Sequence, residues 1–554
     1  MKRLFQFVLF LAVTLPASGQ VINAATCSAA NVQTAINTAT EGQTVTIPAG
    51  TCAWTSGVTI SGKGITVQGA GSGRIIAISA STLTIGTGSK TLTVTGADPG
   101  HTLAISNGAS LTITETGTPT NVLSGTVTSY SAGTLVMNIT SASGSCTITG
   151  TTNCKRWLVS TPSTTVITNN MTGGGGSGAS SSNTLFWITE DTTVHTNVSG
   201  FKIAAGTGAA NGFGIAYASG GQAVLLHDFW VEINPAGSGH PANAVNIFDN
   251  KGVVWNASFD VVTWDQNTGM VGQLDPSENT IASWNSASTF GAADTTGQGN
   301  IYIEDSDFHL GLYCTNTNDN GRMVVRYSMY DNCGHGTHGP DTAPVGQRYF
   351  ESYNNVGVFE GYNDGTTFNM QGWFLIRGGT FAVHDNAFTL ITSTDYGAKP
   401  GLNMEANNVY DNNGGSGPNP CWGAFFSSGA KYHYPRQVGF GYVTGSGTAS
   451  YTGASPNPIY TVSGSTDSHT YVGDSEPAYS WNNSPSLTTL IPTSGEQNNC
   501  SSPDSAANYI VSGRDYFNGS TAKPGYTPYT YPHPLESGSG APAAPTGLTA
   551  VIYW

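Results

Sequence analysis

Charged residues are scarce in this chain, and their scarcity excludes several classes of protein. Only 9% of the 554 residues are Asp, Glu, Lys or Arg, against about 25% in an average soluble protein. Long surface helices need such residues, so a mainly helical fold is not expected. Lys and Arg number 18 against 33 Asp and Glu, which disfavours binding to nucleic acid or anionic membranes. The remaining composition, with 72 Gly, suits short strands joined by tight turns.

Long apolar runs are missing after the first residues. Lys2 and Arg3 precede an apolar stretch from Leu4 to Leu15, and the small residues Ala17-Ser18-Gly19 follow. This order is typical of a secretory signal peptide, and the stretch is too short to span a bilayer well. We therefore expect residues 1–19 to be removed and the protein to be secreted, without membrane insertion. Loss of the two basic residues takes the net charge from −15 to −17.

Spacings typical of zinc sites and of several enzyme families are also missing. No C-x2-C pair occurs among the eight Cys, and the sequence has no G-x-S-x-G, H-E-x-x-H or P-loop motif. An even number of Cys in an exported chain favours disulfides. Neighbours in the sequence suggest the pairs Cys27–Cys52, Cys146–Cys154, Cys314–Cys333 and Cys421–Cys500.

Short strands alternate with turns in the N-terminal part. Apolar–Thr–apolar triplets occur at 45–47, 58–60, 65–67, 83–85, 92–94 and 111–113, separated by Gly, Ser, Lys or Asp. Such alternation turns one face inward and Thr outward. Upstream, Ala29, Val32, Ala35 and Ile36 share one face of a helix expected over Cys27–Thr38. A short helix before many short strands predicts an all-β fold, a parallel β-helix whose first coil is capped by that helix.

A looser repeat in the central part supports the same solenoid. Segments ending in an aromatic residue align at 255–259, 304–308, 326–330, 384–388 and 406–410, and two of the intervals are 22 residues. One coil of a β-helix needs about that length, and Asn at the corners favours stacked turns. We expect the β-helix domain to span residues 20–535, with a small β insertion at about 120–161. Residues 536–554 look like a linker and the truncated start of a fibronectin type III-like module.

Several further motifs occur along the chain, at Gly42–Cys52, Gly62–Gly69, Arg322–Tyr327, His335-Gly336-Thr337, Arg348–Glu351, Arg377–Thr380, Tyr434-Pro435-Arg436 and Tyr526–Leu535. These motifs resemble secreted bacterial proteins of the pectate-lyase-like superfamily. The resemblance covers most of residues 27–535 and implies a right-handed parallel β-helix. The superfamily includes polysaccharide lyases, glycoside hydrolases, epimerases and phage tailspikes, so the fold does not set the reaction.

Ionic residues concentrate between positions 300 and 390, which makes this segment the candidate active site. Arg322, Arg326, Arg348 and Arg377 form a candidate positive patch. A polyuronate lyase must neutralise a substrate carboxylate and remove a neighbouring proton, tasks for Arg or calcium and for a base such as His. The candidate acid–base residues are His335, His338, Asp341 and Glu351, and the candidate calcium ligands are Glu304, Asp305 and Asp307.

Two other functions fit the same segment. A glycoside hydrolase needs paired carboxylates, for which Asp305 with Asp307, and also Asp341, Glu351 and Asp364, are candidates. A non-catalytic surface adhesin that binds glycans is the third possibility. The leading prediction is an extracellular polysaccharide lyase that cleaves an acidic glycan by β-elimination, ahead of the hydrolase and the adhesin.

Structural roles compete with each of these assignments. Arg348 with Glu351 is equally well explained as a plain ion pair, and Arg322 and Arg326 as bridges between adjacent coils. His384 and Asp385 occupy a repeat corner, where a ladder role is favoured.

Overall fold

The computed structural model describes most of the chain between residues 20 and 537. Residues 1–19 and 538–554, Cys146, Cys154, Cys421, Cys500, His338, Asp341, Asp364 and the segment 406–410 lie outside the described residues. The described residues are 20–97, 99–100, 102–116, 118–145, 156–172, 179–190, 192–217, 221–234, 243–262, 269–273, 294–311, 313–318, 320–337, 346–359, 374–390, 401–404, 438–446, 470–491, 510 and 512–537.

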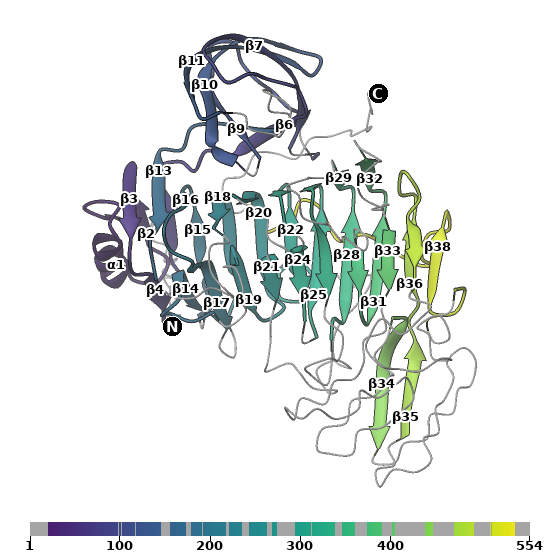
Figure 1. The fold of residues 1–554 in the computed structure, drawn as a ribbon. Helices are drawn as coiled ribbons and strands as arrows, with labels where there is room; N and C mark the ends of the chain where they lie inside the picture. The colour runs from purple at the N-terminus through teal and green to yellow at the C-terminus, as the bar shows by residue number, and fades with distance from the viewer. Residues whose placement is uncertain are drawn as a thin grey trace, which may run out of the picture.

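The N-terminal helix forms where the sequence predicts it. Helix α1 (Ala29–Thr38) begins after Ser28, whose side chain accepts a hydrogen bond from the Asn31 N–H, and it buries Val32, Ala35 and Ile36. The helix packs against the first strands of the coil (Figure 1). The predicted disulfides Cys27–Cys52 and Cys314–Cys333 are both confirmed, with Cα–Cα distances of 5.7 and 5.5 Å.

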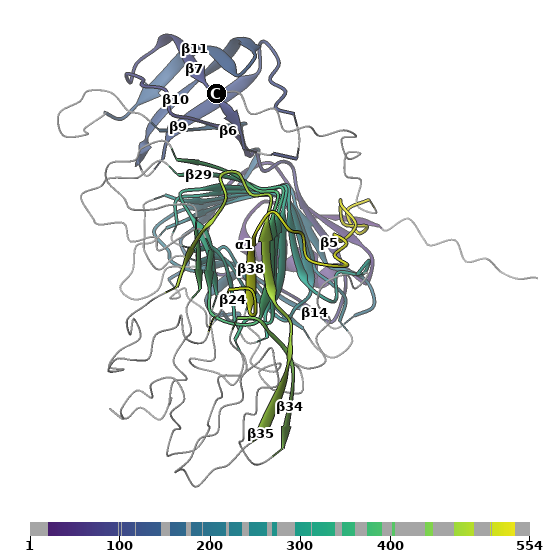
Figure 2. The ribbon, with the colours of Figure 1, turned by 90° about the vertical axis from the view of Figure 1, so that its right-hand side faces the viewer.

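The described chain is nearly all β, and most of its strands pair in parallel. A 19-stranded sheet bends at the long strands β18 (Leu225–Ile233) and β20 (Gly252–Val261) into two faces, which we call wall 1 and wall 2. A 10-stranded sheet forms wall 3. Successive coils run through walls 1, 2 and 3 in turn, as a solenoid requires (Figures 1 and 2). The right-handed sense of the coil stays a prediction from the sequence.

The strands of each wall stack in chain order. Wall 1 contains β1 (Val21–Asn23), β2 (Thr44–Ile47), β5 (Thr66–Gly69), β15 (Asn197–Ser199), the first halves of β18 and β20, β22 (Ile301–Glu304), β25 (Arg322–Arg326), β28 (Tyr349–Tyr353), β31 (Thr380–His384), β36 (Ala478–Trp481) and β38 (Tyr516–Gly519). Wall 2 contains β3 (Gly50–Trp54), β13 (Thr165–Asn169), β16 (Lys202–Ala205), the second halves of β18 and β20, β23 (Asp307–His309), β26 (Met329–Asp331), β29 (Val356–Phe359) and β32 (Ala387–Leu390). Wall 3 contains β4 (Val58–Ser61), β14 (Thr184–Glu190), β17 (Asn211–Tyr217), β19 (Val245–Phe248), β21 (Gly269–Gln273), β24 (Tyr313–Thr317), β27 (Gly334–Thr337), β30 (Phe374–Ile376), β33 (Gly401–Met404) and β37 (Thr488–Leu490).

The corner between walls 1 and 2 explains the central repeat. In the coils from β18 to β36, one residue at this corner adopts a left-handed conformation, with φ between 47° and 54°, which turns the chain without a loop. A ladder of buried Asn follows, in which Asn355 and Asn386 bond across coils and Asn386 bonds to Asn483. The aligned aromatic residues Phe259 and Phe308 stack in the interior at 4.9 Å. The left-handed residues are Asp228, Asn256, Asp305, Tyr327, Asn354, Asp385 and Asn482.

An antiparallel sheet with its own apolar core interrupts the coil. It runs from Ile75 to Ser160 and lies against wall 2 (Figure 1). The sequence placed the insertion at about 120–161, whereas this sheet starts 45 residues earlier. Triplets such as 92–94 alternate in the same way in parallel and antiparallel strands. The strands are β6 (Ile75–Ser79), β7 (Gly88–Thr93), β8 (Thr95–Gly96), β9 (Ser110–Glu115), β10 (Thr118–Ser131), β11 (Thr134–Ser143) and β12 (Trp157–Ser160).

A segment near the C-terminal end, residues 520–537, packs along the outside of wall 1, and we call it the strap. The Tyr526 hydroxyl is hydrogen-bonded to Glu351 and His384. Tyr529 packs on Tyr302, and Leu535 belongs to the apolar cluster that these two tyrosines form. A separate two-stranded hairpin is formed by β34 (Phe440–Ser446) and β35 (Thr470–Ser475). None of the helices in the described part of the chain combines the length and the apolar character that crossing a membrane requires.

Candidate functional site

Wall 2 carries a row of ionisable side chains on its outer face. Glu232, Asp260, His309 and Asp331 stand in register on four successive coils. Their apolar strand neighbours, such as Val231 and Phe259, belong to the interior core, so period two sends the ionisable residues outward. Adjacent strands lie about 4.8 Å apart, which brings these side chains within reach of one another.

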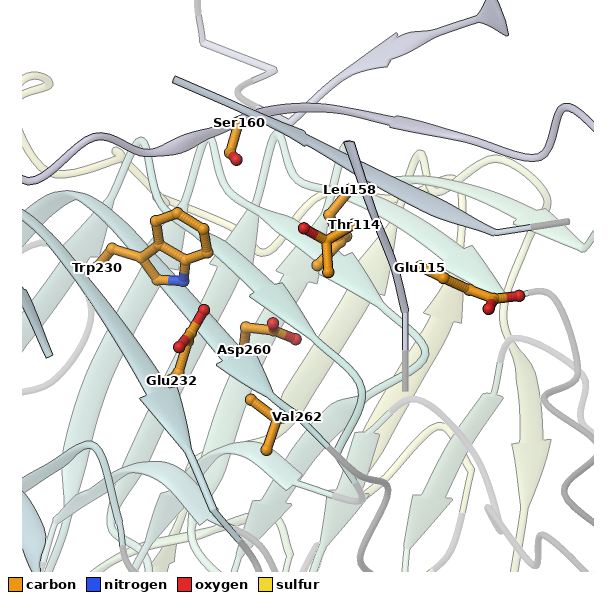
Figure 3. A pocket seen from close by; sticks show the side chains of 8 residues that line it. All are labelled: Thr114, Glu115, Leu158, Ser160, Trp230, Glu232, Asp260 and Val262. Atoms are coloured by element: carbon orange, nitrogen blue, oxygen red, sulfur yellow. The ribbon is translucent and has the colours of Figure 1, made fainter. Parts of the chain in front are cut away.

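A pocket lies where this row meets the insertion (Figure 3). It is narrow, with an enclosed volume of about 10 Å³, which is about the space of one water molecule. Strands β9 and β12 contribute one side of the pocket, and β18 and β20, with the residue after β20, contribute the other. The lining residues are Thr114, Glu115, Leu158, Ser160, Trp230, Glu232, Asp260 and Val262.

Asp260 is the most perturbed group in this pocket. Its side chain is 7% exposed, and its Oδ1 atom has no hydrogen-bond partner. Burial raises the pKa of Asp260 to about 7, with further contributions from the negative charges of Glu232 and Asp331 and opposition from His309 and Lys202. Asp260 therefore holds a proton up to near-neutral pH and releases it readily above that.

Glu232, the neighbour of Asp260 on the previous coil, is paired with a cation. The Lys202 ammonium lies 2.5 Å from its carboxylate, and the Ala205 N–H donates a hydrogen bond to it at 3.2 Å. Lys202 also lies over the ring of Trp230, 3.2 Å from the centroid. Glu232 is therefore held by a cation and a backbone N–H. Figure 3 shows Glu232 and Asp260 facing the same space, while the Glu115 carboxylate points away from them.

Glu115 is the third carboxylate of the pocket, and it belongs to the insertion. The Asn121 side chain donates a hydrogen bond to it at 2.6 Å. Burial raises its pKa, against that hydrogen bond and the charge of Arg156. The insertion thus adds a satisfied acid at the rim rather than a third reactive group.

A buried ionic network extends the row beyond Asp260. His309 lies between Asp307, at 2.8 Å, and Asp331, at 3.0 Å, and Arg156 of the insertion reaches Asp331 at 3.1 Å. Burial opposes the charge on His309, but the hydrogen bonds and charges of the two carboxylates raise its pKa to about 10. His309 is therefore an imidazolium at neutral pH, one coil away from Asp260.

The residues singled out from the sequence on wall 1 are engaged by the strap. Glu304 and Arg326 are fully buried as an ion pair, and the Arg326 guanidinium also donates to the carbonyls of Tyr529 and Thr530 at 2.8 and 2.7 Å. The His533 N–H donates to Glu304 at 2.9 Å. Arg326 thus bridges adjacent coils, the structural alternative considered from the sequence, and it holds the strap in place.

Glu351 is buried under the same strap. The hydroxyls of Tyr349 and Tyr526 both donate to its carboxylate. Burial raises the pKa of Glu351 to about 7, although these hydrogen bonds and the charge of Arg326 oppose the rise. Arg348 pairs with Glu476 at 2.8 Å and not with Glu351, so the ion pair considered from the sequence does not form.

The three candidate calcium ligands are not brought together. Glu304 faces outward on wall 1 beneath the strap, Asp305 occupies the corner and accepts from the Tyr531 hydroxyl at 2.5 Å, and Asp307 belongs to the His309 network of wall 2. The corner turn at Asp305 separates it from Asp307, so these two candidate carboxylates do not share one strand. Among the described residues, no group of three or more His, Cys, Asp or Glu is arranged to hold a metal ion.

The remaining candidates lie at separate places. His335 is inside the coil, stacked on Phe350 and bonded to Thr315 and Gln347, and burial lowers its pKa to about 3. It is a neutral core residue and does not reach the outer surface. Arg322 begins β25, whereas Arg377 follows β30 and donates its N–H to Thr337. The predicted positive patch is therefore divided among several corners of the coil.

Sequence reasoning missed Glu232, Asp260, Lys202 and Trp230. The aligned repeats contained a usable signal, because the residue after the last aromatic is Asp260, His309 or Asp331 in successive coils. Reading one position beyond each aligned segment would have placed three ionisable residues on one row.

Comparisons with known proteins add little to this geometry. No family model and no curated protein matches the sequence, but ten solved chains match. A tailspike of Acinetobacter baumannii bacteriophage AP22, solved with A. baumannii capsular saccharide, has a TM-score of 0.23 and 11% identity; the match covers 69% of this chain and 66% of the tailspike, just under two thirds of its length. A protein described as a glycoside hydrolase has a TM-score of 0.16 and 8% identity, covering 67% and 89%. The Yersinia enterocolitica family 28 exopolygalacturonase has a TM-score of 0.19 and 9% identity, covering 69% and 77%. Such low TM-scores mean that these likenesses carry no argument about the fold or function of this chain.

Proposed function

We propose that this chain is a secreted, right-handed β-helix enzyme that hydrolyses glycosidic bonds of a polysaccharide on the outer face of wall 2, beside the insertion. The observation that carries the proposal is the pairing of Glu232 and Asp260 on adjacent coils. One of these carboxyls is desolvated and retains its proton near pH 7, and the other is ion-paired with Lys202. Glycoside hydrolysis requires two carboxyl groups, of which one keeps its proton to act as the general acid.

The roles follow from the two environments. Protonated Asp260 donates its proton to the oxygen of the leaving sugar, and Glu232, held by Lys202, acts on the opposite side of the scissile bond. Adjacent coils are about 4.8 Å apart, closer to the carboxyl separation of about 5–5.5 Å used for retention than to the wider one used for inversion. We therefore assign Glu232 as the nucleophile of a retaining reaction, whose glycosyl intermediate water hydrolyses with Asp260 as the base.

Elimination, the leading prediction from the sequence, has weaker support. It calls for a free positive group beside the substrate carboxylate, whereas Arg326 is engaged with Glu304 and the strap, and Arg348 with Glu476. The lyase reaction, its calcium requirement and the non-catalytic adhesin remain alternatives that a single experiment separates.

The experiment is incubation with a panel of neutral and acidic polysaccharides, with and without calcium or a chelator. New reducing ends without absorbance near about 235 nm indicate hydrolysis, and absorbance at that wavelength indicates the unsaturated ends of elimination. We expect Asp260→Asn and Glu232→Gln each to reduce cleavage by about 100-fold or more.

The matched control is Glu190→Gln. Glu190 is buried, is hydrogen-bonded to Thr196 at 2.6 Å, and ends β14 on wall 3. Its substitution should leave cleavage unchanged. Full activity in the two pocket variants would refute the proposed site, and glycan binding without any product would favour the adhesin.

A further inference from the structure

The strap crosses wall 1 without joining its sheet. No part of residues 520–537 forms a strand in the described chain, so the attachment of the strap depends on side chains. Arg326 and Glu304 hold its middle. Residues 520–528, which we call the strap end, are held by Tyr526, whose neighbour Gly525 is exposed. The strap end can therefore leave wall 1 while the sheet beneath it stays intact.

Tyr526 lies in a chain of hydrogen bonds that joins two coils. Its hydroxyl is bonded to Glu351 of β28 and, at 2.8 Å, to Nε2 of His384 of β31. The other ring nitrogen of His384, Nδ1, lies 2.7 Å from a carboxylate oxygen of Asp385. Glu351 is 1% exposed and His384 is 4% exposed, so the closed strap leaves little room for water to take part in these bonds.

One O–H cannot supply both hydrogen bonds of Tyr526. A tyrosine hydroxyl has a single proton, and an ionised carboxylate only accepts. When Tyr526 donates to Glu351, His384 must donate to the Tyr526 oxygen from Nε2. Because it also donates to Asp385 from Nδ1, it is then an imidazolium. When His384 is neutral, Tyr526 donates to its Nε2, and Glu351 must be protonated to donate to Tyr526. Both arrangements contain the same extra proton.

Burial decides where this proton lies. It lowers the pKa of His384, against the hydrogen bond and the charge of Asp385, and it raises the pKa of Glu351 to about 7. The hydrogen bond from His384 lowers the pKa of Asp385, so that carboxylate stays ionised. The extra proton therefore lies on Glu351 and leaves as the pH rises through about 7.

The other groups that face Glu351 do not replace this proton. Tyr349 donates to the second oxygen of the carboxylate, and the charge of Arg326 on the adjacent coil lowers the pKa of Glu351 without overcoming burial. Burial raises the pKa of Tyr353 and of Tyr529, so neither ionises near neutral pH.

His384 and the strap end have few other partners. The His384 ring is stacked between Tyr353 and Trp481, with centroids 4.9 and 4.1 Å away. The one charged side chain of the strap end, Lys523, lies over the ring of Tyr479, 5.3 Å from its centroid. Burial lowers the pKa of Lys523, and the charge of Glu476 opposes this. These contacts do not supply a donor to Glu351 or to His384.

Loss of the extra proton leaves two acceptors facing one O–H. Glu351 and His384 then compete for the proton of Tyr526, and one of them stays buried without a donor, which destabilises the closed strap. Water supplies the missing donor once the strap end has left the wall.

We propose that the strap end is a pH-sensitive latch, closed while Glu351, Tyr526 and His384 share one extra proton and open once that proton is lost. Its opening uncovers the stacked rings of Tyr353, His384 and Trp481 on wall 1. The latch depends on wall 1 alone and is independent of the hydrolase proposed on wall 2.

Hydrogen exchange of residues 520–528 measures the opening of the latch. Exchange is followed by mass spectrometry at pH 5 and pH 8 and corrected for the intrinsic rate. The pKa of Glu351 rises from 4.5 to about 7 in the closed form, so its contribution is complete below 4.5 and is lost as the pH rises to about 7. Protection should fall at least about 10-fold, the value of one buried hydrogen bond, while β28 stays protected. Equal protection at the two pH values would overturn the proposal.

Two substitutions separate the latch from a general loosening. Glu351→Gln should keep the strap end closed at pH 8, because the carboxamide donates to Tyr526 and accepts from Tyr349 at every pH. Tyr526→Phe removes both hydrogen bonds, so protection should be low already at pH 5 and change little at pH 8. If Glu351→Gln opens between pH 5 and pH 8 as the wild type does, the latch is refuted.

Glu536→Gln is the matched control. Glu536 is a 4% exposed acid of the strap, and burial and the neighbouring Glu304 raise its pKa to about 11. It is not part of the chain through Tyr526, so this variant should lose protection of residues 520–528 at pH 8 as the wild type does. A pH response that disappears in Glu536→Gln and persists in Glu351→Gln would place the release elsewhere in the strap and contradict the proposal.

Discussion

Walls 1 and 2 are outer faces of the same stack of coils, and both carry buried acidic residues, yet their coverings differ. On wall 1 the strap supplies carbonyls, an N–H and a tyrosine hydroxyl that match Arg326, Glu304 and Glu351. On wall 2 the insertion pairs with Asp331 through Arg156 but leaves an oxygen of Asp260 unpaired. A dense group of buried charges thus indicates a stabilising role where the covering segment pairs all of its polar atoms. It indicates a chemical role where the covering segment leaves a polar atom unpaired.

The largest effect is expected on wall 1, from Arg326→Met. This substitution leaves Glu304 buried without its cation and removes the donors to Tyr529 and Thr530, so the free energy of unfolding should fall by about 3–5 kcal/mol. Denaturant titration measures it. The double variant Glu304→Gln/Arg326→Met should recover most of the loss, because both charges are then removed. A loss below about 1 kcal/mol would show that the strap does not depend on this pair.

On wall 2, His309→Gln should cost less, about 2–4 kcal/mol, because Asp331 keeps Arg156. The imidazolium of His309 lowers the pKa of Asp260, so the variant should also move the alkaline limb of the activity profile to higher pH. Arg326→Met should leave that limb in place. An identical pH profile in His309→Gln and the wild type would show that the network does not act on Asp260.

One buried carboxyl on each wall should make the free energy of unfolding depend on pH in the same direction. Burial raises the pKa of Glu351 and of Asp260 to about 7, from 4.5 and 3.8. Both groups bind more protons when folded, so their contribution is complete below about pH 4 and is lost as the pH rises to about 7. Each contributes roughly 1–3 kcal/mol. We expect Glu351→Gln and Asp260→Asn each to flatten the difference in unfolding free energy between pH 5 and pH 8, and an unchanged difference would contradict the assignment.

The smallest effect is expected where the insertion meets wall 2. Ser258 accepts from the Ile75 N–H at 3.0 Å and donates to Asp307 at 3.0 Å. Ser258→Ala should cost about 1–2 kcal/mol. If a protease cuts the insertion of this variant faster than it cuts the coil, the loss of stability lies at this contact. Equal cleavage rates in the insertion and the coil would contradict that location.

Local sequence patterns were sufficient to predict the coil. The site was predicted less well, because it depends on contacts between segments that are distant in the chain. The capping helix, the register of Phe259 with Phe308 and two disulfides follow from spacings of a few residues to one coil. The direction in which His335 points depends on where its strand begins, which periodicity alone does not provide. The strap contacts join residues about 200 apart in the chain, such as Arg326 and Thr530, and no local pattern reports such a pairing.

The strap also has a consequence for assembly. Each coil pairs mainly with its neighbours, so coils can be added one after another as the chain emerges. The strap returns from the far end of this stack across coils completed much earlier, and it can fasten only when that stack already exists. Until then Glu304 and Arg326 are open to water and to proteases. The closing of residues 520–537 therefore distinguishes a finished molecule from an incomplete one.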